Sequence, residues 1–240
     1  MERVGICDGC HAGCCRTFAV PVTGADIIRI RRATGLSFWD FVCRWADSDH
    51  QIAKDVVPHF HFPDQPAMPF VIALAHAASP IFPGTTKCRF LLEGLPDTAH
   101  PLGQGRCCIY LHRPMACRAF PAKLNETGEL AELQSVPGHA RDEAVAVYQL
   151  CPRPWEPEDL DPVETPQTLA VIRYEMAFFH NVARLWNRQP QPWTAFPDFL
   201  DYVYSRRILP VSADEAPDTE PVIASLPLVQ PRTTFRAKAA

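Results

Sequence analysis

Residues 7–15 read CDGCHAGCC, and this stretch holds four of the chain's ten cysteines. Cys7 and Cys10 form a C-x-x-C pair, a spacing that lets two thiolates turn toward one metal ion. The adjacent Cys14 and Cys15 cannot easily chelate the same ion without strain, so we expect them to face two metals or opposite sides of one cluster. By count alone, these four thiolates could complete a zinc or iron–sulfur site.

The composition is that of an ordinary globular protein, with 47% apolar and 21% charged residues over 240 positions. The net charge of -4 argues against nucleic acid as the main partner. No apolar run reaches the roughly 18 residues of a transmembrane helix, and the first ten residues lack the apolar core of a signal peptide. We therefore expect a cytoplasmic protein without a membrane span, in which cysteines serve as metal ligands or redox groups rather than disulfides.

The hydrophobic pattern predicts an α+β fold that is mainly helical, with short strands and long loops around a cysteine-ligated site. Thr23 and Gly35 are typical caps of a helix over 24–34. Ser37 and Asp40 resemble a capping box and predict a second helix through FWDFVCRWA, residues 38–46. Further helices are expected over 140–150, over 166–187 and from Pro197 to about 207, with one or two helical turns in 111–120.

Strands are expected in KCRFLL, residues 87–92, and in RCCIY, residues 106–110. Residues 41–87 form a Pro- and aromatic-rich segment without a clear period, which we interpret as an insert. We predict one metal-binding domain over 1–209, followed by a Pro-rich flexible tail over 210–240.

A second cysteine-rich block, CCIYLHRPMACRAFP at residues 107–121, lies about one hundred residues after the first. It is preceded by CRFLL, residues 88–92. Together with CDGCHAGCC, these blocks resemble the YkgJ-like CxxCxxCC cysteine-cluster family, whose members are described as zinc- or iron-chelating proteins. The resemblance covers roughly residues 7–36 and 86–151.

The resemblance implies eight family-type ligands: Cys7, Cys10, Cys14, Cys15, Cys88, Cys107, Cys117 and Cys151. Two features depart from the family pattern. Three residues rather than two precede the Cys14–Cys15 pair, which leaves open which of the two takes the inner position. The segment 41–87 is an insertion relative to compact members of the family.

Three side chains near the second block are candidates for holding the anionic centre: Arg113, Arg118 and Tyr110. A centre with four thiolates carries net negative charge, and nearby arginines would stabilise it, although Arg113 could instead bind backbone carbonyls of its turn. Cys43 is expected to be a buried apolar residue on the second helix. The role of Cys108 stays open between ligand and core residue.

Three functions are compatible with this sequence. The first is a metal-binding protein that holds a 4Fe–4S cluster, zinc or iron. The second, implied by distant similarity to the cluster region of flagellin lysine methylase, is a cluster-dependent enzyme that modifies a protein or peptide, although no S-adenosylmethionine motif is visible. The third is a zinc-stabilised module that docks a protein partner. The sequence does not decide whether the chain is an enzyme.

Overall fold

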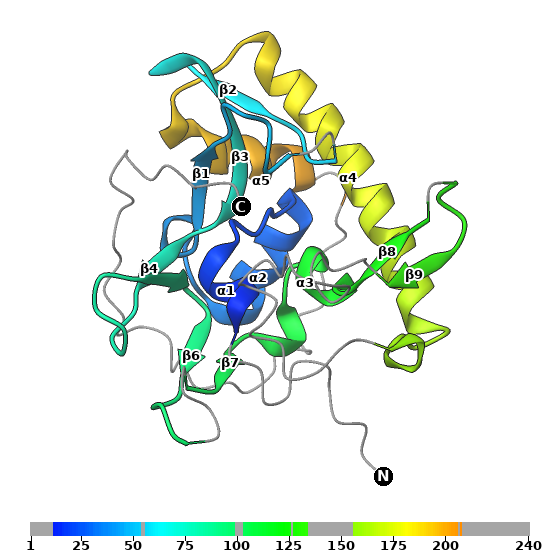
Figure 1. Ribbon diagram of the computed structural model, residues 1–240. Helices are drawn as coiled ribbons and strands as arrows, with labels where there is room; N and C mark the ends of the chain where they lie inside the picture. The colour runs from blue at the N-terminus through cyan, green and yellow to red at the C-terminus, as the bar shows by residue number, and fades with distance from the viewer. Residues whose placement is uncertain are drawn as a thin grey trace.

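The computed structural model describes residues 12–53, 56–98, 103–125, 127–133, 156–205 and 207. The helices within these ranges are α1 (Gly13–Thr17), α2 (Gly24–Thr34), α3 (Met115–Ala119), α4 (Glu164–Arg188) and α5 (Phe196–Ser205). The strands are β1 (Val42–Ala46), β2 (Phe60–Phe62), β3 (Gln65–Leu74), β4 (His76–Ala78), β5 (Thr86–Cys88), β6 (Leu91–Glu93), β7 (Gly105–Cys107), β8 (Ala122–Leu124) and β9 (Ala131–Leu133). The fold class is therefore α+β (Figure 1).

The strands form one three-stranded sheet, in the order β1-β3-β2, and three two-stranded hairpins, β4-β5, β6-β7 and β8-β9, all antiparallel. The long strand β3 supplies the centre of the core, because its last five residues are buried. The chain before α2 extends this sheet, since the amide of Val22 donates to the carbonyl of Ile72 and the amide of Leu74 donates to the carbonyl of Val20.

Helices α4 and α5 pack against the sheet through aromatic side chains. The ring centroids of Phe60 and Phe179 lie 5.1 Å apart, and those of Phe62 and Trp186 lie 5.6 Å apart. Trp186 also meets Phe196 of α5 at 5.0 Å. Figure 1 shows the long α4 running past β2 at one end and the β8-β9 hairpin at the other.

Several expected helices are confirmed. Helix α2 spans the predicted 24–34, with Thr23 and Asp26 in a reciprocal capping box and Gly35 in the left-handed region at φ 69°. The two C-terminal helices match α4 and α5 within a few residues, and α3 is the short helix expected after Pro114. The strand predicted over 87–92 is split into β5, which ends at Cys88, and β6, which begins at Leu91; of the strand predicted over 106–110, only the start forms, as the end of β7.

The predicted helix over 38–46 is wrong. The capping box of Ser37 and Asp40 forms as expected, but it starts only the 3₁₀ turn η1 (Phe38–Asp40). The chain then enters β1, which pairs with β3 from Val42 opposite Leu74 to Ala46 opposite Phe70. Aromatic and β-branched residues favour such a pleated, half-buried surface, and pairing with a distant strand outweighs the local helix-start signal.

The segment 41–87, predicted as an insert, contributes to the core. It carries β1 to β4 and the start of β5, and Phe60, Phe62 and Ile72 within it are fully buried. The helix expected over 140–150 and the tail expected over 210–240 lie outside the described residues. No helix in the described ranges is long and apolar enough to cross a bilayer.

Candidate metal centre

Five of the eight predicted ligands lie within the described residues, on four separate segments. Cys14 and Cys15 belong to α1, Cys88 ends β5, Cys107 ends β7 and Cys117 lies in α3. Cys7, Cys10 and Cys151 fall outside the described residues. The four segments come from positions up to about a hundred residues apart, so only the fold can bring them together.

The charge of Cys14 acts on thiols from all of these segments. It contributes to raising the pKa values of Cys15, Cys88, Cys107 and Cys117. Electrostatic interactions of this kind weaken with distance, so they indicate that the five sulfurs lie in the same part of the molecule.

The adjacent cysteines of α1 differ in acidity. A hydrogen bond from the Cys15 thiol stabilises the Cys14 thiolate and, despite burial, lowers the Cys14 pKa to about 7. The same hydrogen bond, together with burial, raises the pKa of Cys15 far above its ordinary value. One thiolate of the pair is therefore accessible near neutral pH, and thiolates are the form that binds metal.

Cys88 and Cys107 share a local geometry. Burial raises the pKa of both thiols, that of Cys88 to about 12. In each case a backbone hydrogen bond from the residue two positions later, Phe90 or Ile109, acts in the opposite direction. Amide donors aimed at sulfur favour the thiolate, so these two positions suit metal ligation once a cation offsets the cost of burial.

Arg113 lies near the sulfurs. Burial raises the pKa values of Cys117 and Cys107, and the charge of Arg113 opposes both rises. The guanidinium stacks on the Tyr110 ring at 3.7 Å from the centroid and donates through Nε to the Tyr110 carbonyl at 3.0 Å. The two roles considered for Arg113, at the site and at its own turn, are therefore both compatible with its position.

The other two cofactor-binding candidates lie differently. Arg118 reaches Glu164 of α4, at 3.6 Å between Nη2 and Oε1. Tyr110 is exposed and presents its ring to Arg113. The contact between Arg118 and Glu164 joins α3 to α4.

Two cations next to Cys88 were not among the predicted site residues. Lys87 and Arg89 are only 2% and 4% exposed, and both oppose the rise in the pKa of Cys108, which burial brings to about 11. The sequence Lys-Cys-Arg at 87–89 could have pointed to them, because it places a cation on each side of a predicted ligand. Buried cations are costly unless negative charge lies nearby; Glu93 supplies it for Lys87, and ionised thiolates would add to it.

A buried carboxylate anchors the cysteine-bearing helix α1. Glu93 of β6 accepts hydrogen bonds from Arg16 of α1 and from the Ser79 hydroxyl, at 2.8 Å to Oε2. Lys87 Nζ lies 3.7 Å from the same carboxylate. The side chain of Glu93 is 1% exposed, so this network ties α1 to the β5 and β6 strands in a low-dielectric environment.

The start of α1 also sits tightly on β7. Ala12 adopts the left-handed conformation at φ 59°, and a Cβ added at Gly105 would lie 2.3 Å from the Ala12 Cβ. Only glycine leaves room for this approach. Gly105 therefore permits the first cysteine block to lie beside the second.

Cys43 has a different environment. It lies on strand β1, and its thiol donates to the carbonyls of Ala73 and Leu74 at 3.6 and 3.4 Å. Burial raises its pKa to about 12. A protonated thiol held by carbonyl acceptors is a structural group, although the expected location on a helix was wrong.

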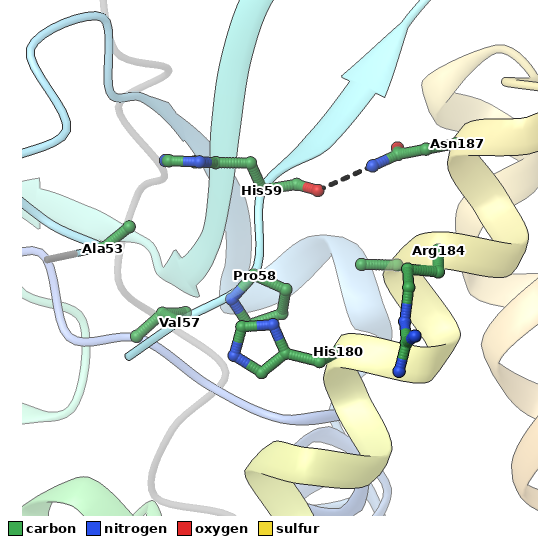
Figure 2. Close-up of a pocket in the computed structure, with 8 residues that line it drawn as sticks. Ala53, Val57, Pro58, His59, His180, Arg184 and Asn187 are labelled. Carbon is green, nitrogen blue, oxygen red and sulfur yellow. Dashed lines mark hydrogen bonds between the residues drawn. The ribbon is translucent and has the colours of Figure 1, made fainter. Parts of the chain in front are cut away.

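A pocket of about 260 Å³ lies away from the cysteines, between α4 and the loop before β2 (Figure 2). Its polar side chains are engaged internally. His59 Nε2 pairs with Asp47 at 2.9 Å, Asn187 donates to the His59 carbonyl at 2.8 Å, and His180 Nε2 donates to the Val56 carbonyl at 3.0 Å. Two of these bonds, from Asn187 and His180, fasten α4 to the loop.

The donor set of the cysteine region fits a thiolate-rich metal centre, because soft thiolates select zinc, iron–sulfur clusters and related ions. In the described part of the chain, however, no three Cys, His, Asp or Glu side chains are already arranged to hold an ion. The described sulfurs influence one another electrostatically, but they are not arranged around a common point as metal ligands would be. Three of the eight predicted ligands lie outside the described residues.

The comparisons with known proteins agree with this chemistry. The family model CxxCxxCC, described as "Putative zinc- or iron-chelating domain", matches residues 6–135, which is more than half of the 240 residues. No curated protein and no solved structure gave a significant match. The matched span contains seven of the eight predicted ligands, all but Cys151, and the chain belongs to the CxxCxxCC family.

Proposed function

We propose that this protein binds zinc or iron through a constellation of eight cysteines, with a 4Fe–4S cluster as one form of the centre. The ligand set would be Cys7, Cys10, Cys14, Cys15, Cys88, Cys107, Cys117 and Cys151. The observation that carries the proposal is the match of residues 6–135 to a family model for a zinc- or iron-chelating domain, because this span contains seven of the eight cysteines. The influence of the Cys14 charge on Cys15 and on thiols of three other segments supports it.

The cations around the sulfurs support an anionic centre. Arg113 acts on Cys107 and Cys117, while Lys87 and Arg89 act on Cys108. A tetrathiolate zinc site and an oxidised 4Fe–4S cluster with four thiolates both carry a net charge of about −2, which these side chains would balance. Hydrogen bonds and positive charge near sulfur also tune the potential of a cluster.

Two cysteine substitutions test the ligand assignment. Cys117→Ser removes a predicted ligand, whereas Cys43→Ser alters a thiol that donates to backbone carbonyls. We expect Cys117→Ser purified without oxygen to lose most of its bound metal, and Cys43→Ser to retain the wild-type content. Metal loss in Cys43→Ser combined with full retention in Cys117→Ser would overturn the assignment.

The same preparation separates the other two functions. A cluster-dependent enzyme of the methyl-transfer type should bind S-adenosylmethionine, which equilibrium dialysis with the reconstituted protein measures. A zinc-stabilised docking module should be colourless and unfold with a chelator, without a reducible absorption band. A brown protein with a reducible spectrum excludes the zinc module.

A further inference from the structure

Asp26 of α2 caps two helices at once. Its Oδ2 accepts the Thr23 amide at 3.1 Å and the Thr23 hydroxyl at 3.0 Å, which completes the capping box of α2. Its Oδ1 accepts the amide of Met115 at 3.0 Å, and Met115 is the first residue of α3. The residue is 1% exposed, so water does not replace these bonds.

Arg29 completes the connection between α2 and the second cysteine block. Its Nη2 donates to Asp26 Oδ1 at 2.6 Å and to the carbonyl of Arg113 at 2.9 Å. Asp26 and Arg29 thus hold the backbone on both sides of Pro114. Cys117 follows two residues after Met115, and the Arg113 side chain, which acts on Cys107 and Cys117, leaves the same segment.

We propose that Asp26 and Arg29 are positioning residues that set the location of Cys117 and Arg113 in the metal centre. The inference rests on the proposed metal-binding function, and it adds a role for two side chains that carry no ligand atom. Helix α3 has only five residues and makes few internal hydrogen bonds, so it depends on outside groups for its orientation. The Asp26 carboxylate supplies one such group, from a helix almost ninety residues earlier.

The chemistry of the carboxylate explains why an amide would not replace it. Four hydrogen-bond donors converge on the two oxygens of Asp26, from Thr23, Arg29 and Met115. Asparagine offers one oxygen and a donor NH₂ group, which would face the existing donors. Asp26→Asn keeps the size of the side chain but removes half of its acceptor capacity and its charge.

Asp47→Asn is a matched control. Asp47 is also buried, at 3% exposure, and its carboxylate also accepts backbone amides, from Ile52 and Ala53 at 2.9 and 3.0 Å. It lies in the loop before β2 and contacts no part of the second cysteine block in the described residues. The substitution should lower stability in a comparable way without changing the position of Cys117.

The experiment titrates Co²⁺ into the reduced, metal-free full-length protein and follows thiolate-to-cobalt charge-transfer absorption. Relative to wild type, we expect Asp26→Asn to bind Co²⁺ roughly 10–100-fold more weakly, the usual cost of losing a group that orients a ligand. Arg29→Ala, at a partly exposed position that should tolerate substitution, should shift affinity in the same direction. Asp47→Asn should remain within about twofold of wild type.

A second readout needs no metal. In the metal-free protein, iodoacetamide labelling followed by mass spectrometry gives the alkylation rate of Cys117 relative to Cys88. We expect Asp26→Asn and Arg29→Ala to raise this ratio several-fold, and Asp47→Asn to leave it unchanged. An unchanged ratio in both α2 variants overturns the positioning role, whereas failure of wild type to bind Co²⁺ counts against the proposed metal centre alone.

Discussion

Glu93 offers a quantitative test of how the cysteine-bearing helix α1 is held. Glu93→Gln keeps the shape of the side chain but removes the negative charge that faces Arg16 and Lys87. Lys87 is 2% exposed, so its ammonium group would lose a nearby counter-charge in a buried environment. Breaking a buried pair in this way typically costs about 3–5 kcal/mol of unfolding free energy.

The matched control is Asp64→Asn, which breaks an ion pair of the same type at the surface. Asp64 pairs with Arg44, but half of its side chain is exposed. Exposed pairs contribute about 0.2–1 kcal/mol, so this variant should unfold almost like wild type. The comparison therefore isolates the effect of burial.

The assay is urea denaturation of the reduced, metal-free protein, followed by circular dichroism at neutral pH. Removing metal ensures that the measured free energy reports the Arg16–Glu93–Lys87 network and not ligand binding. The expected order is wild type and Asp64→Asn together, with Glu93→Gln well below them. A loss under about 1 kcal/mol for Glu93→Gln, equal to that of Asp64→Asn, would refute the anchoring role.

Three further outcomes are expected. Burial would raise the pKa of Asp47, but hydrogen bonds from Ile52, His59 and Ala53 lower it overall. The contribution of the Asp47 carboxylate to folding stability is therefore complete above about pH 3.9 and is lost as the pH falls through the folded pKa. Asp47→Asn should flatten this part of a plot of unfolding free energy against pH. Gly105→Ala should lower the unfolding free energy by about 1–3 kcal/mol in denaturant titrations, because its Cβ overlaps that of Ala12. Chelator treatment should lower the melting temperature of metal-loaded protein, since metal binding stabilises only the folded state.

The sequence was most informative where the signal is local. The caps of α2 depend on Thr23, Asp26 and Gly35, which lie within or beside the helix itself, and the helix was predicted with its observed ends. The long apolar period of α4 was equally clear. Such signals are read from neighbouring residues without knowledge of the tertiary fold.

Long-range pairing was not predictable in the same way. The stretch from Ser37 to Ala46 has a good helix start, yet β3 recruits Val42–Ala46 as a strand. The partner residues Phe70–Leu74 lie almost thirty positions later. The alternation of apolar and polar residues in their segment is too irregular to predict a strand. Pairing with a distant strand therefore outweighed the local preference of this stretch for a helix.

For the site, the cysteines were visible in the sequence and their surroundings were not. Lys87 and Arg89 flank Cys88 directly, but a charged residue in a sequence is normally expected at the surface, and both are buried. Glu93 and Asp26 gave no signal at all for a role near the cysteines, because their partners are distant in sequence. Arg113 was predicted because it stands within the cysteine block itself.

The most direct test of the account is the iron, zinc and acid-labile sulfide content of the wild-type protein purified without oxygen. The proposed centre predicts zinc near stoichiometry, or iron near stoichiometry with a matching amount of sulfide when the centre is a 4Fe–4S cluster. Protein that is folded and fully reduced, yet contains neither iron nor zinc near stoichiometry, would contradict it.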